Sequence, residues 1–264
     1  MSNDKLKSYI SGGISGLIEV SFVHPIEYFK TTKQYSNKKI NFTSFIRTTY
    51  SENGIKSLYK GFLPRVTGVV PMRTVFWGTM YVSDNYLSNT SIDKKYIYPI
   101  SGVIAGSIQT LIDCPIESLK TKMMTSNASI RNSLNFNGFT PNLIRNVGFA
   151  AIFNYQKNVM KQKYLDEGKD IRFMDNFYIG CVSGIAASII TQPFDYVKTK
   201  MQEKIEKKVP MRKIMYNTLK NNPALFFSGT IPRASITCIS MSIGLPVFEL
   251  VNNNFSKFNN FLNI

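Results

Sequence analysis

The sequence has few of the residues that metal sites, disulfide frameworks and catalytic centres require. It contains one histidine and three cysteines in 264 residues. Cys114, Cys181 and Cys238 stand in apolar surroundings, without a CxxC motif or a paired spacing, so we expect neither a disulfide framework nor a metal site. No nucleophile stands beside a base, and no phosphate-binding P-loop is present. The sequence therefore predicts that the protein is not an enzyme and has no cofactor.

Acidic residues are also scarce. The chain has 16 Asp and Glu against 32 Lys and Arg, which gives a formal net charge of +16. A charge of this size indicates anionic partners, which can be nucleic acid, phospholipid head groups or small anionic solutes. A soluble, basic, helical protein that binds nucleic acid is one way to explain it. Charge alone does not separate these classes of partner.

A long uninterrupted apolar run is missing as well. No window of the chain holds about 20 consecutive apolar residues, which argues against helices surrounded by lipid on all sides. Helices with one face on lipid and another on a water-filled cavity remain compatible with this pattern. The first residues, MSNDKLKSYISGG, lack an Arg-rich presequence and a cleavage site, so any organelle targeting signal is expected inside the chain.

What the sequence does contain is a threefold repeat. The segment HPIEYFKTTKQ recurs as CPIESLKTKMM and as QPFDYVKTKMQ. Each copy has a proline, an acid two residues later and a lysine five residues after the proline. These residues are Pro25, Glu27 and Lys30, then Pro115, Glu117 and Lys120, then Pro193, Asp195 and Lys198. Three copies in phase predict one domain with repeats at about 1–91, 92–168 and 169–264.

Each repeat also predicts two helices. A GxxxG pair precedes each proline, and such pairs let helices approach closely in a membrane. The pairs are Gly12 and Gly16, Gly102 and Gly106, and Gly180 and Gly184. A second apolar segment follows Gly61, Gly138 and Gly229. We therefore expect an all-α membrane protein with six transmembrane helices, at about 7–36, 64–88, 95–125, 140–163, 172–203 and 230–254.

The connection inside the second repeat is shorter than the other two. The intervals from Pro25 to Gly61 and from Pro193 to Gly229 are each 36 residues, whereas Pro115 to Gly138 is 23 residues. In the first repeat, NFTSFIRTTYSENG at 41–54 has the pattern of a short amphipathic helix on a membrane surface. We expect no equivalent helix in the second repeat.

The threefold motif, together with an aromatic-basic-glycine element such as Tyr59-Lys60-Gly61, resembles the mitochondrial carrier family. The resemblance covers nearly the whole chain. It implies a multi-pass protein of the mitochondrial inner membrane, with six helices in three pseudo-symmetric two-helix repeats around a central cavity. It also implies transport of a solute by alternating access.

In that family the three motifs form a gate at the matrix end of the cavity. The resemblance implies ion pairs of Glu27 with Lys120, Glu117 with Lys198 and Asp195 with Lys30, and helix kinks at Pro25, Pro115 and Pro193. Gln34 and Gln202 match the glutamine that braces this gate. Ion pairs whose formation costs desolvation contribute little net stability, so they suit a conformational switch better than a permanent helix contact. The alternative is that these pairs only hold the bundle together.

A second gate at the opposite end is expected to be weak. The family places an aromatic-acid pair and a following base near the ends of the even-numbered helices. The corresponding segments here are YVSDN at 81–85, FNYQK at 153–157 and FELVN at 248–252. Only Phe248-Glu249 keeps the aromatic-acid pair, and Asn252 replaces its base. We therefore predict a weak or largely polar outer ring.

The resemblance also indicates the residues that contact the solute. They follow the glycine before each even-numbered helix by about seven residues, and basic residues stand nearby. The expected set is Arg65, Gly68, Arg73, Arg145, Asn146, Arg233 and Ile236. Glu19, six residues before Pro25, is expected to contact the solute or to pair with an arginine. Arginines that face a cavity bind phosphate or carboxylate.

Which anion these residues bind is left open by the sequence. The number of arginines and the small Gly68 favour nucleotides or deoxynucleotides. The many Lys, Asn and Ile residues suggest an AT-rich genome, such as that of a giant DNA virus, which would need to import or exchange nucleotides. The Arg145-Asn146 pair instead resembles carriers of keto acids and other carboxylates. A membrane scaffold that does not transport is a third alternative. The expected partners are a small anionic solute and membrane lipid, including cardiolipin, but no nucleic acid, and we expect a monomer.

Overall fold

The computed structural model describes residues 2–36, 42–59, 62–125, 139–203 and 210–255. Inside these ranges, the structure describes the backbone alone for several side chains in the helices. Those positions are 2–3, 27, 29–36, 42, 52–53, 64, 94, 115–125, 199 and 201–203. Every regular element in the described part of the chain is a helix.

Six long helices match the six predicted segments to within a few residues. They are α1 (Ser2–Ser36), α3 (Phe62–Ser88), α4 (Lys94–Thr125), α5 (Phe139–Asp166), α6 (Phe173–Glu203) and α8 (Thr230–Asn253). Shorter elements are α2 (Phe42–Asn53), α7 (Met211–Asn221) and the 3-10 helices η1 (Gly54–Tyr59) and η3 (Pro223–Phe227). The predicted amphipathic helix at 41–54 is confirmed as α2. The expectation for the second repeat concerns residues 126–138, which lie outside the described part.

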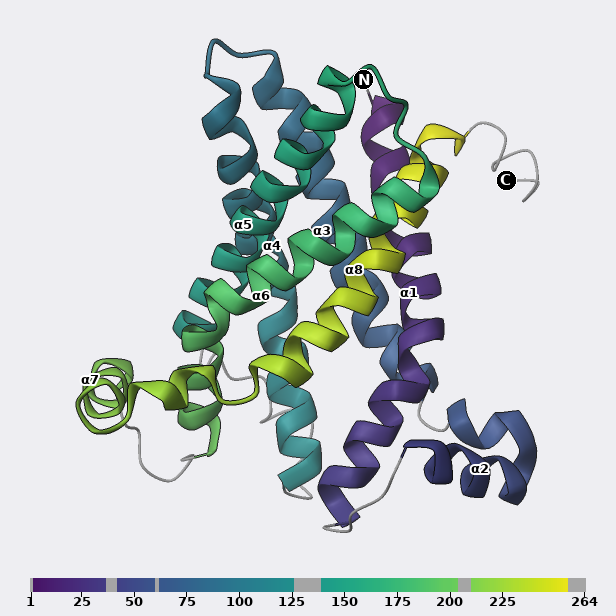
Figure 1. Cartoon of the computed structure of the whole chain (residues 1–264), viewed down its shortest axis with the longest axis vertical. Helices are drawn as coiled ribbons and strands as arrows, with labels where there is room; N and C mark the ends of the chain where they lie inside the picture. Colours follow the sequence, from purple (N-terminus) through teal and green to yellow (C-terminus); the bar gives the residue numbers. More distant parts are fainter. Residues whose placement is uncertain (1, 37–41, 60–61, 126–138, 204–209, 256–264) are drawn as a thin grey trace.

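The six long helices pack side by side in a closed ring. Each contacts the next in the order α1, α3, α4, α5, α6 and α8, and α8 packs back against α1. Figure 1 shows α2 and α7 extending sideways from the same end of this bundle, opposite the N-terminus. Neighbours in the ring are therefore mostly neighbours in sequence, as expected from repeats of two helices.

The GxxxG glycines lie where the two helices of a repeat approach each other. A Cβ added at Gly16 of α1 would come within 2.6 Å of Arg73 Cβ on α3. A Cβ at Gly106 of α4 would come within 2.8 Å of the Asn146 carbonyl oxygen on α5. Contacts this short leave no room for a side chain, so the prediction of close helix packing at these glycines is confirmed.

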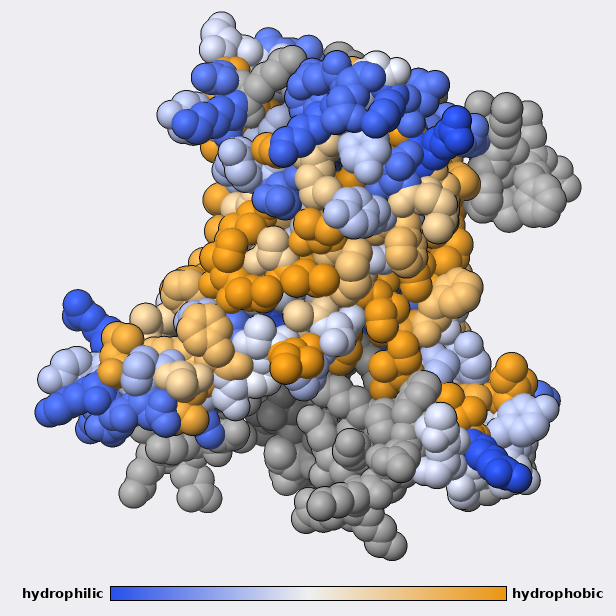
Figure 2. All heavy atoms as spheres, in the orientation of Figure 1, coloured by the Kyte–Doolittle hydropathy of each residue, from blue (hydrophilic) through white to orange (hydrophobic). Residues whose placement is uncertain are grey.

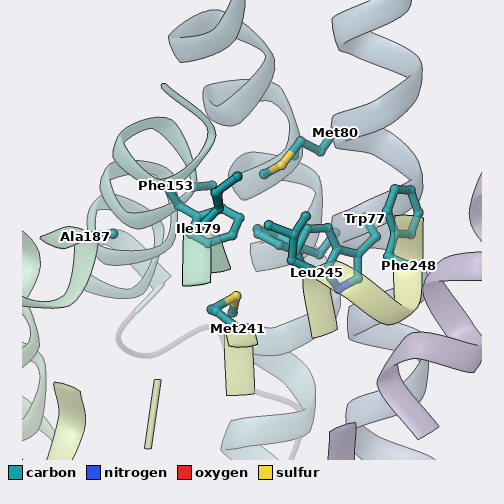
Figure 3. Packing of buried hydrophobic residues seen from close by; sticks show 11 residues of the cluster. Trp77, Met80, Phe153, Ile179, Ala187, Met241, Leu245 and Phe248 are labelled. Carbon is teal, nitrogen blue, oxygen red and sulfur yellow. The ribbon is translucent and has the colours of Figure 1, made fainter. Parts of the chain in front are cut away.

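An apolar plug fills the space between α3, α5 and α8. It consists of Phe76, Trp77, Met80, Phe153, Leu245 and Phe248, all nearly fully buried. Figure 3 shows five of them, Trp77, Met80, Phe153, Leu245 and Phe248, packed together. The Trp77 and Phe248 rings stack at 5.3 Å, and Trp77 meets Phe153 edge to face at 5.8 Å. Aromatic pairs with these geometries add stabilisation beyond their buried area.

The outer surface has the character of a membrane protein. Figure 2 shows a hydrophobic band across the middle of the visible face, with hydrophilic residues at both ends. In the described part of the chain, three segments are long and apolar enough to cross a membrane: Lys95–Cys114, Phe173–Lys198 and Pro223–Asn253. The other three long helices, α1, α3 and α5, do not meet this criterion, and some of their ionisable side chains, such as Glu19, Arg73 and Arg145, contact residues of neighbouring helices. Such residues lower the mean hydropathy of a helix without facing lipid.

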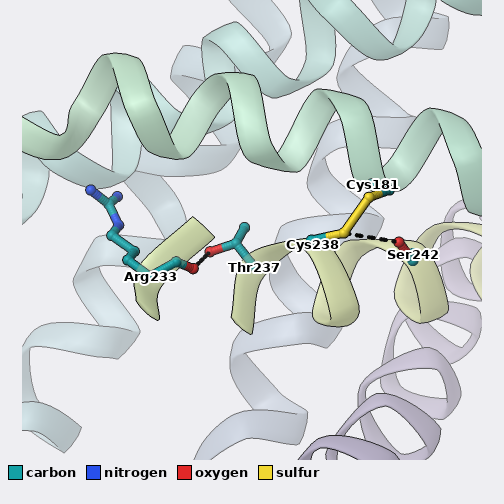
Figure 4. Close-up of a disulfide and its surroundings, with 5 residues drawn as sticks. All are labelled: Cys181, Arg233, Thr237, Cys238 and Ser242. Carbon is teal, nitrogen blue, oxygen red and sulfur yellow. Dashed lines mark hydrogen bonds between the residues drawn. A yellow bond between two sulfur atoms is a disulfide. The ribbon is translucent and has the colours of Figure 1, made fainter. Parts of the chain in front are cut away.

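The structure corrects one expectation from the sequence. Cys181 of α6 and Cys238 of α8 form a disulfide (Figure 4), although we expected none. The cause is the close approach of these two helices at Gly180, where a Cβ would collide with the backbone of Met241. This approach brings the two cysteine Cα atoms to 4.3 Å. The spacing of the cysteines along the sequence, 57 residues, gives no sign of it.

Candidate functional site

A first polar cluster joins α1, α3 and α8 next to the apolar plug. The Arg73 guanidinium of α3 donates to Glu19 Oε1 of α1 at 2.5 Å. Ser240 of α8 donates to the same carboxylate oxygen at 2.6 Å. The Arg73 guanidinium also lies 5.8 Å from the Phe76 ring of the plug. This arrangement confirms the expectation that Glu19 pairs with an arginine.

A second polar cluster joins α4, α5 and α6. The Arg145 guanidinium of α5 reaches Asp113 Oδ2 of α4 at 3.3 Å and Asp195 Oδ1 of α6 at 3.4 Å. Asn146 accepts from Arg145 at 2.9 Å and donates to Asp113 at 3.1 Å. Asn142 also donates to Asp113, at 3.2 Å. One arginine therefore bridges two carboxylates that belong to two different helices.

A third cluster lies between α6 and α8 around Arg233. Its guanidinium donates to Thr191 Oγ1 at 2.9 Å, to Gln192 Oε1 at 3.2 Å and to the Ser188 carbonyl at 3.4 Å. All three acceptors are neutral. Arg233 also interacts electrostatically with Asp195 and Arg145 of the second cluster. Within the described residues, the hydrogen bonds of Arg233 thus go to neutral groups, and its charge is compensated only through the Asp195 carboxylate of the second cluster.

The other predicted contact residues lie on the same helices as these clusters. Arg65 is half-buried and interacts electrostatically with Glu19 and Arg73. Gly68 is buried, and Ile236 is half-buried on α8. The structure therefore collects the three predicted arginines that have described contacts, Arg73, Arg145 and Arg233, into clusters between neighbouring helices. The second and third clusters contain acceptors that we had not named from the sequence, among them Asp113, Thr191 and Gln192.

The predicted matrix gate is described only in part. Asp195 is paired with Arg145, and Lys198 Nζ donates to Asn142 Oδ1 at 2.9 Å. Pro25 and Pro193 lie inside α1 and α6, which continue as helices beyond them. Several predicted side chains lie outside the described residues, so the expected pairs stay predictions: Glu27, Lys30, Glu117, Lys120, Gln34, Gln202 and Pro115.

The outer end of the bundle is held more firmly than we expected. Asp84 of α3 lies 3.7 Å from Lys157 Nζ of α5, and Lys161 Nζ of α5 lies 2.5 Å from Glu249 Oε1 of α8. Asn154 also donates to Asp84, at 2.8 Å. The prediction of a weak or merely polar ring is therefore wrong: two ion pairs connect α5 to both other helices of the plug.

The sequence contains the reason for this error. The three residues that stand 23 positions after Gly61, Gly138 and Gly229 are Asp84, Lys161 and Asn252. The segment 153–157 therefore lies one helical turn before the equivalent positions, and Lys161 was overlooked. Asp84 is an acid at a position where the family has a base. Its ion-pair partner is accordingly a base, Lys157 of α5.

A cavity of about 240 Å³ opens at this end, above the plug. Its walls include Trp77 and Phe248 of the plug, both ion pairs, and Tyr98 of α4. Along α3, the plug residues Phe76, Trp77 and Met80 stand between Arg73 of the first cluster and Asp84 of this cavity, so the plug lies between the two.

Two residues of the second cluster were not predicted. Asn142 follows Pro141 directly, where Arg65 and Arg233 stand in the other repeats. Asp113 stands two residues before Pro115, where the other repeats have Val23 and Thr191. Both departures from the threefold pattern make the second cluster more acidic, because one position loses a base and the other gains an acid. This paired departure from symmetry was the signal in the sequence.

Comparison with known proteins gives matches along most of the chain. A family model described as "Mitochondrial carrier protein" matches residues 2–91 and 169–259. "Tricarboxylate transport protein A, mitochondrial" of Danio rerio is 27% identical over 94% of this chain and 78% of its own length. "Mitochondrial 2-oxodicarboxylate carrier" of Rattus norvegicus is 24% identical over 76% of either protein. "Mitochondrial glycine transporter" of Homo sapiens is 24% identical over 94% of this chain and 90% of its own length.

Proposed function

The chain belongs to the mitochondrial carrier family, and on this premise we propose that it exchanges small carboxylates across the mitochondrial inner membrane. Members of this family are transporters of that membrane rather than enzymes. The relatives named above are described as carriers of tricarboxylates, 2-oxodicarboxylates and glycine, and none of them is named for a nucleotide. The nucleotide expectation therefore has no support from these relatives, and carboxylates replace it in our proposal.

The observation that carries this proposal is the set of carboxylates that the arginines contact within the bundle. Arg73 holds the carboxylate of Glu19, and Arg145 holds those of Asp113 and Asp195. The Arg145 guanidinium, which already contacts two carboxylates, then binds a carboxylate of the solute in the same way, while Arg73 stays paired with Glu19. Arg233, with its neutral acceptors, provides a further positive charge at the same level of the bundle.

Arg145 also suggests how binding is coupled to movement. It contacts Asp195, an acid of the predicted matrix gate, as well as Asp113. A solute carboxylate that takes over Arg145 releases Asp195, which then becomes available to Lys30, its expected partner in the gate. Because the same arginine serves both groups, occupation of the site shifts the balance toward a closed matrix end. The plug and the two outer ion pairs would then have to open for release on the other side.

We further propose that all six long helices cross the membrane as one domain of three repeats. The helices α1, α3 and α5 fall below the hydropathy of a simple span, but some of their charged residues, such as Glu19, Arg73 and Lys157, are paired with residues of neighbouring helices. The short helices α2 and α7 then lie along the lipid head groups at the matrix end. Both carry exposed aromatic residues, Tyr50 and Tyr216, and α7 adds Arg212, Lys213 and Lys220, which suits anionic lipid.

The experiment that tests the coupling compares variants of Arg145 in liposomes. Arg145→Ala should abolish exchange of a labelled dicarboxylate against an internal dicarboxylate, because the variant loses both the solute contact and the hold on Asp195. Arg145→Lys should keep a small fraction, since lysine supplies charge but no bidentate geometry. Arg172→Ala, at an exposed loop residue, is the control. Normal exchange by Arg145→Ala would contradict the proposal and favour a scaffold role.

A further inference from the structure

Glu19 is a buried acid in a site that is otherwise built to attract anions. Its side chain is 3% exposed, and it lies between α1, α3 and α8. Its Oε1 atom accepts from both Arg73 and Ser240. Its Oε2 atom is buried and has no hydrogen-bond partner among the described residues. A carboxylate with half of its acceptors unused is not the arrangement that best stabilises a helix contact.

The acid is also specific to the first repeat. The residues six positions before the other two signature prolines are Gln109 and Ala187. Neither can carry a negative charge, so the three repeats differ at this level of the cavity by one full charge. Threefold packing of the helices thus does not require an acid here. The functional consequence of Glu19 is the charge that it brings to Arg73.

A count of the charges in the three clusters shows how Glu19 affects the net charge of the site. The described ionisable residues there are Arg65, Arg73, Arg145, Lys198 and Arg233 on the positive side and Glu19, Asp113 and Asp195 on the negative side. Five positive and three negative groups leave an excess of two positive charges. By sequence, Glu27 and Glu117 balance Lys30 and Lys120. In a site whose charged side chains are mostly buried, the preferred ligand is the one whose charge compensates the excess.

We infer that Glu19 is a specificity-determining residue that occupies Arg73 and thereby sets the preferred solute to a dianion. This inference rests on the proposed function, because it assumes that the solute is a carboxylate. With Glu19 in place, Arg73 is neutralised and a dicarboxylate compensates the remaining charge through Arg145 and Arg233. Without the acid, Arg73 is released and a third carboxylate of the solute gains a partner.

The test is the ratio of tricarboxylate to dicarboxylate exchange at pH 8, where both solutes are fully ionised. Glu19→Gln keeps the shape of the side chain and removes its charge, and it should raise this ratio by about tenfold relative to the wild-type chain. Glu19→Asp should keep a ratio close to the wild-type value. Ser240→Ala removes a hydrogen bond to Glu19 without changing the charge, so its ratio should also stay close to the wild-type value.

Asp170→Asn controls for the loss of a negative charge elsewhere, because Asp170 is exposed in the loop before α6. An unchanged ratio in a Glu19→Gln protein that melts like the wild type would overturn the inference. So would an equal rise in the ratio for Asp170→Asn or Ser240→Ala. If the wild-type chain exchanges neither carboxylate, the proposed function itself is contradicted, and the inference falls with it.

Discussion

Asp84 and Lys157 show how single residues close the outer end of this bundle. Their side chains are 15% and 8% exposed, and Lys157 also lies 3.8 Å from the Met80 sulfur of the plug. A lysine in such surroundings depends on its carboxylate partner, since an isolated buried charge is costly. Lys169 and Glu167 form a contrasting pair on the surface, with both side chains about 60% exposed. Exposed pairs of that kind contribute little to stability.

Asp84→Asn should therefore destabilise the detergent-solubilised protein by about 3 kcal/mol, because it leaves the Lys157 ammonium without its counter-charge. The measurement is the melting temperature. The double variant Asp84→Asn with Lys157→Met should recover much of the loss, since the buried charge is removed as well. Glu167→Gln should leave the melting temperature unchanged. Equal effects of Asp84→Asn and Glu167→Gln would show that burial does not govern the Asp84 pair.

At the residue scale, the sequence predicted the cations better than their partners. Arg145 was found because it stands at the solute-contact position that the resemblance implies, and Arg73 and Arg233 were found as basic residues near those positions. Asp113 and Asn142 were missed because they depart from the repeat, and a comparison between repeats emphasises what they share. The pair of Lys161 with Glu249 was missed because a shift of one helical turn preserves an apolar pattern while exchanging the charged residue.

At the element scale, helix contacts depend on small residues at a few positions. A Cβ at Gly106 of α4 would meet the backbone of Asn146 and Val147 on α5, both at 2.8 Å. A Cβ at Gly148 of α5 would meet only the Thr191 methyl group, at 3.2 Å. Backbone atoms cannot move aside as a methyl group can, so the two glycines differ in what they tolerate.

We expect Gly106→Ala to destabilise the protein by about 2 kcal/mol through overpacking of α4 against α5. Gly148→Ala introduces the same methyl group into a helix and should change stability by less than about 1 kcal/mol. Melting curves of the two purified variants test this difference directly. A Gly106→Ala protein as stable as Gly148→Ala would mean that α4 and α5 are less closely packed than the structure has them.

The disulfide between α6 and α8 leads to a separate prediction. Cys114 is a buried thiol, whereas Cys181 and Cys238 are bonded to each other. Titration of the denatured protein with a thiol reagent should therefore find about one thiol per chain before reduction and about three after it. Cys238→Ala should lower the stability by about 2–5 kcal/mol. Three thiols before reduction would show that the two cysteines are only neighbours.

At the scale of the whole molecule, the ring of helices follows from the sequence more directly than any side-chain contact. The positions of the six long helices could be predicted because the GxxxG pair and the proline recur at the same interval in all three repeats, and a glycine precedes the second helix of each. The apolar plug could not be predicted in this way. It depends on how far α3, α5 and α8 lean toward the axis, which is a property of the bundle in one conformation.

In this conformation the two ends of the bundle differ. The plug and two ion pairs close the end near the chain termini, and the arginine clusters lie on the other side of the plug. In our account, a carboxylate therefore reaches Arg145 from the end that carries α2 and α7 and leaves after the plug has opened. Exchange follows if the empty site returns only slowly between the two conformations.

The central claim is that this site serves carboxylates, and exchange in liposomes tests it most directly. Purified protein is reconstituted in vesicles loaded with unlabelled dicarboxylate or unlabelled nucleotide, and uptake of each labelled solute is measured. We predict rapid uptake of labelled dicarboxylate into dicarboxylate-loaded vesicles, little uptake into nucleotide-loaded ones, and loss of the signal in Arg145→Ala. Uptake that requires internal nucleotide would contradict the account and would indicate that the arginines bind the phosphate groups of a nucleotide.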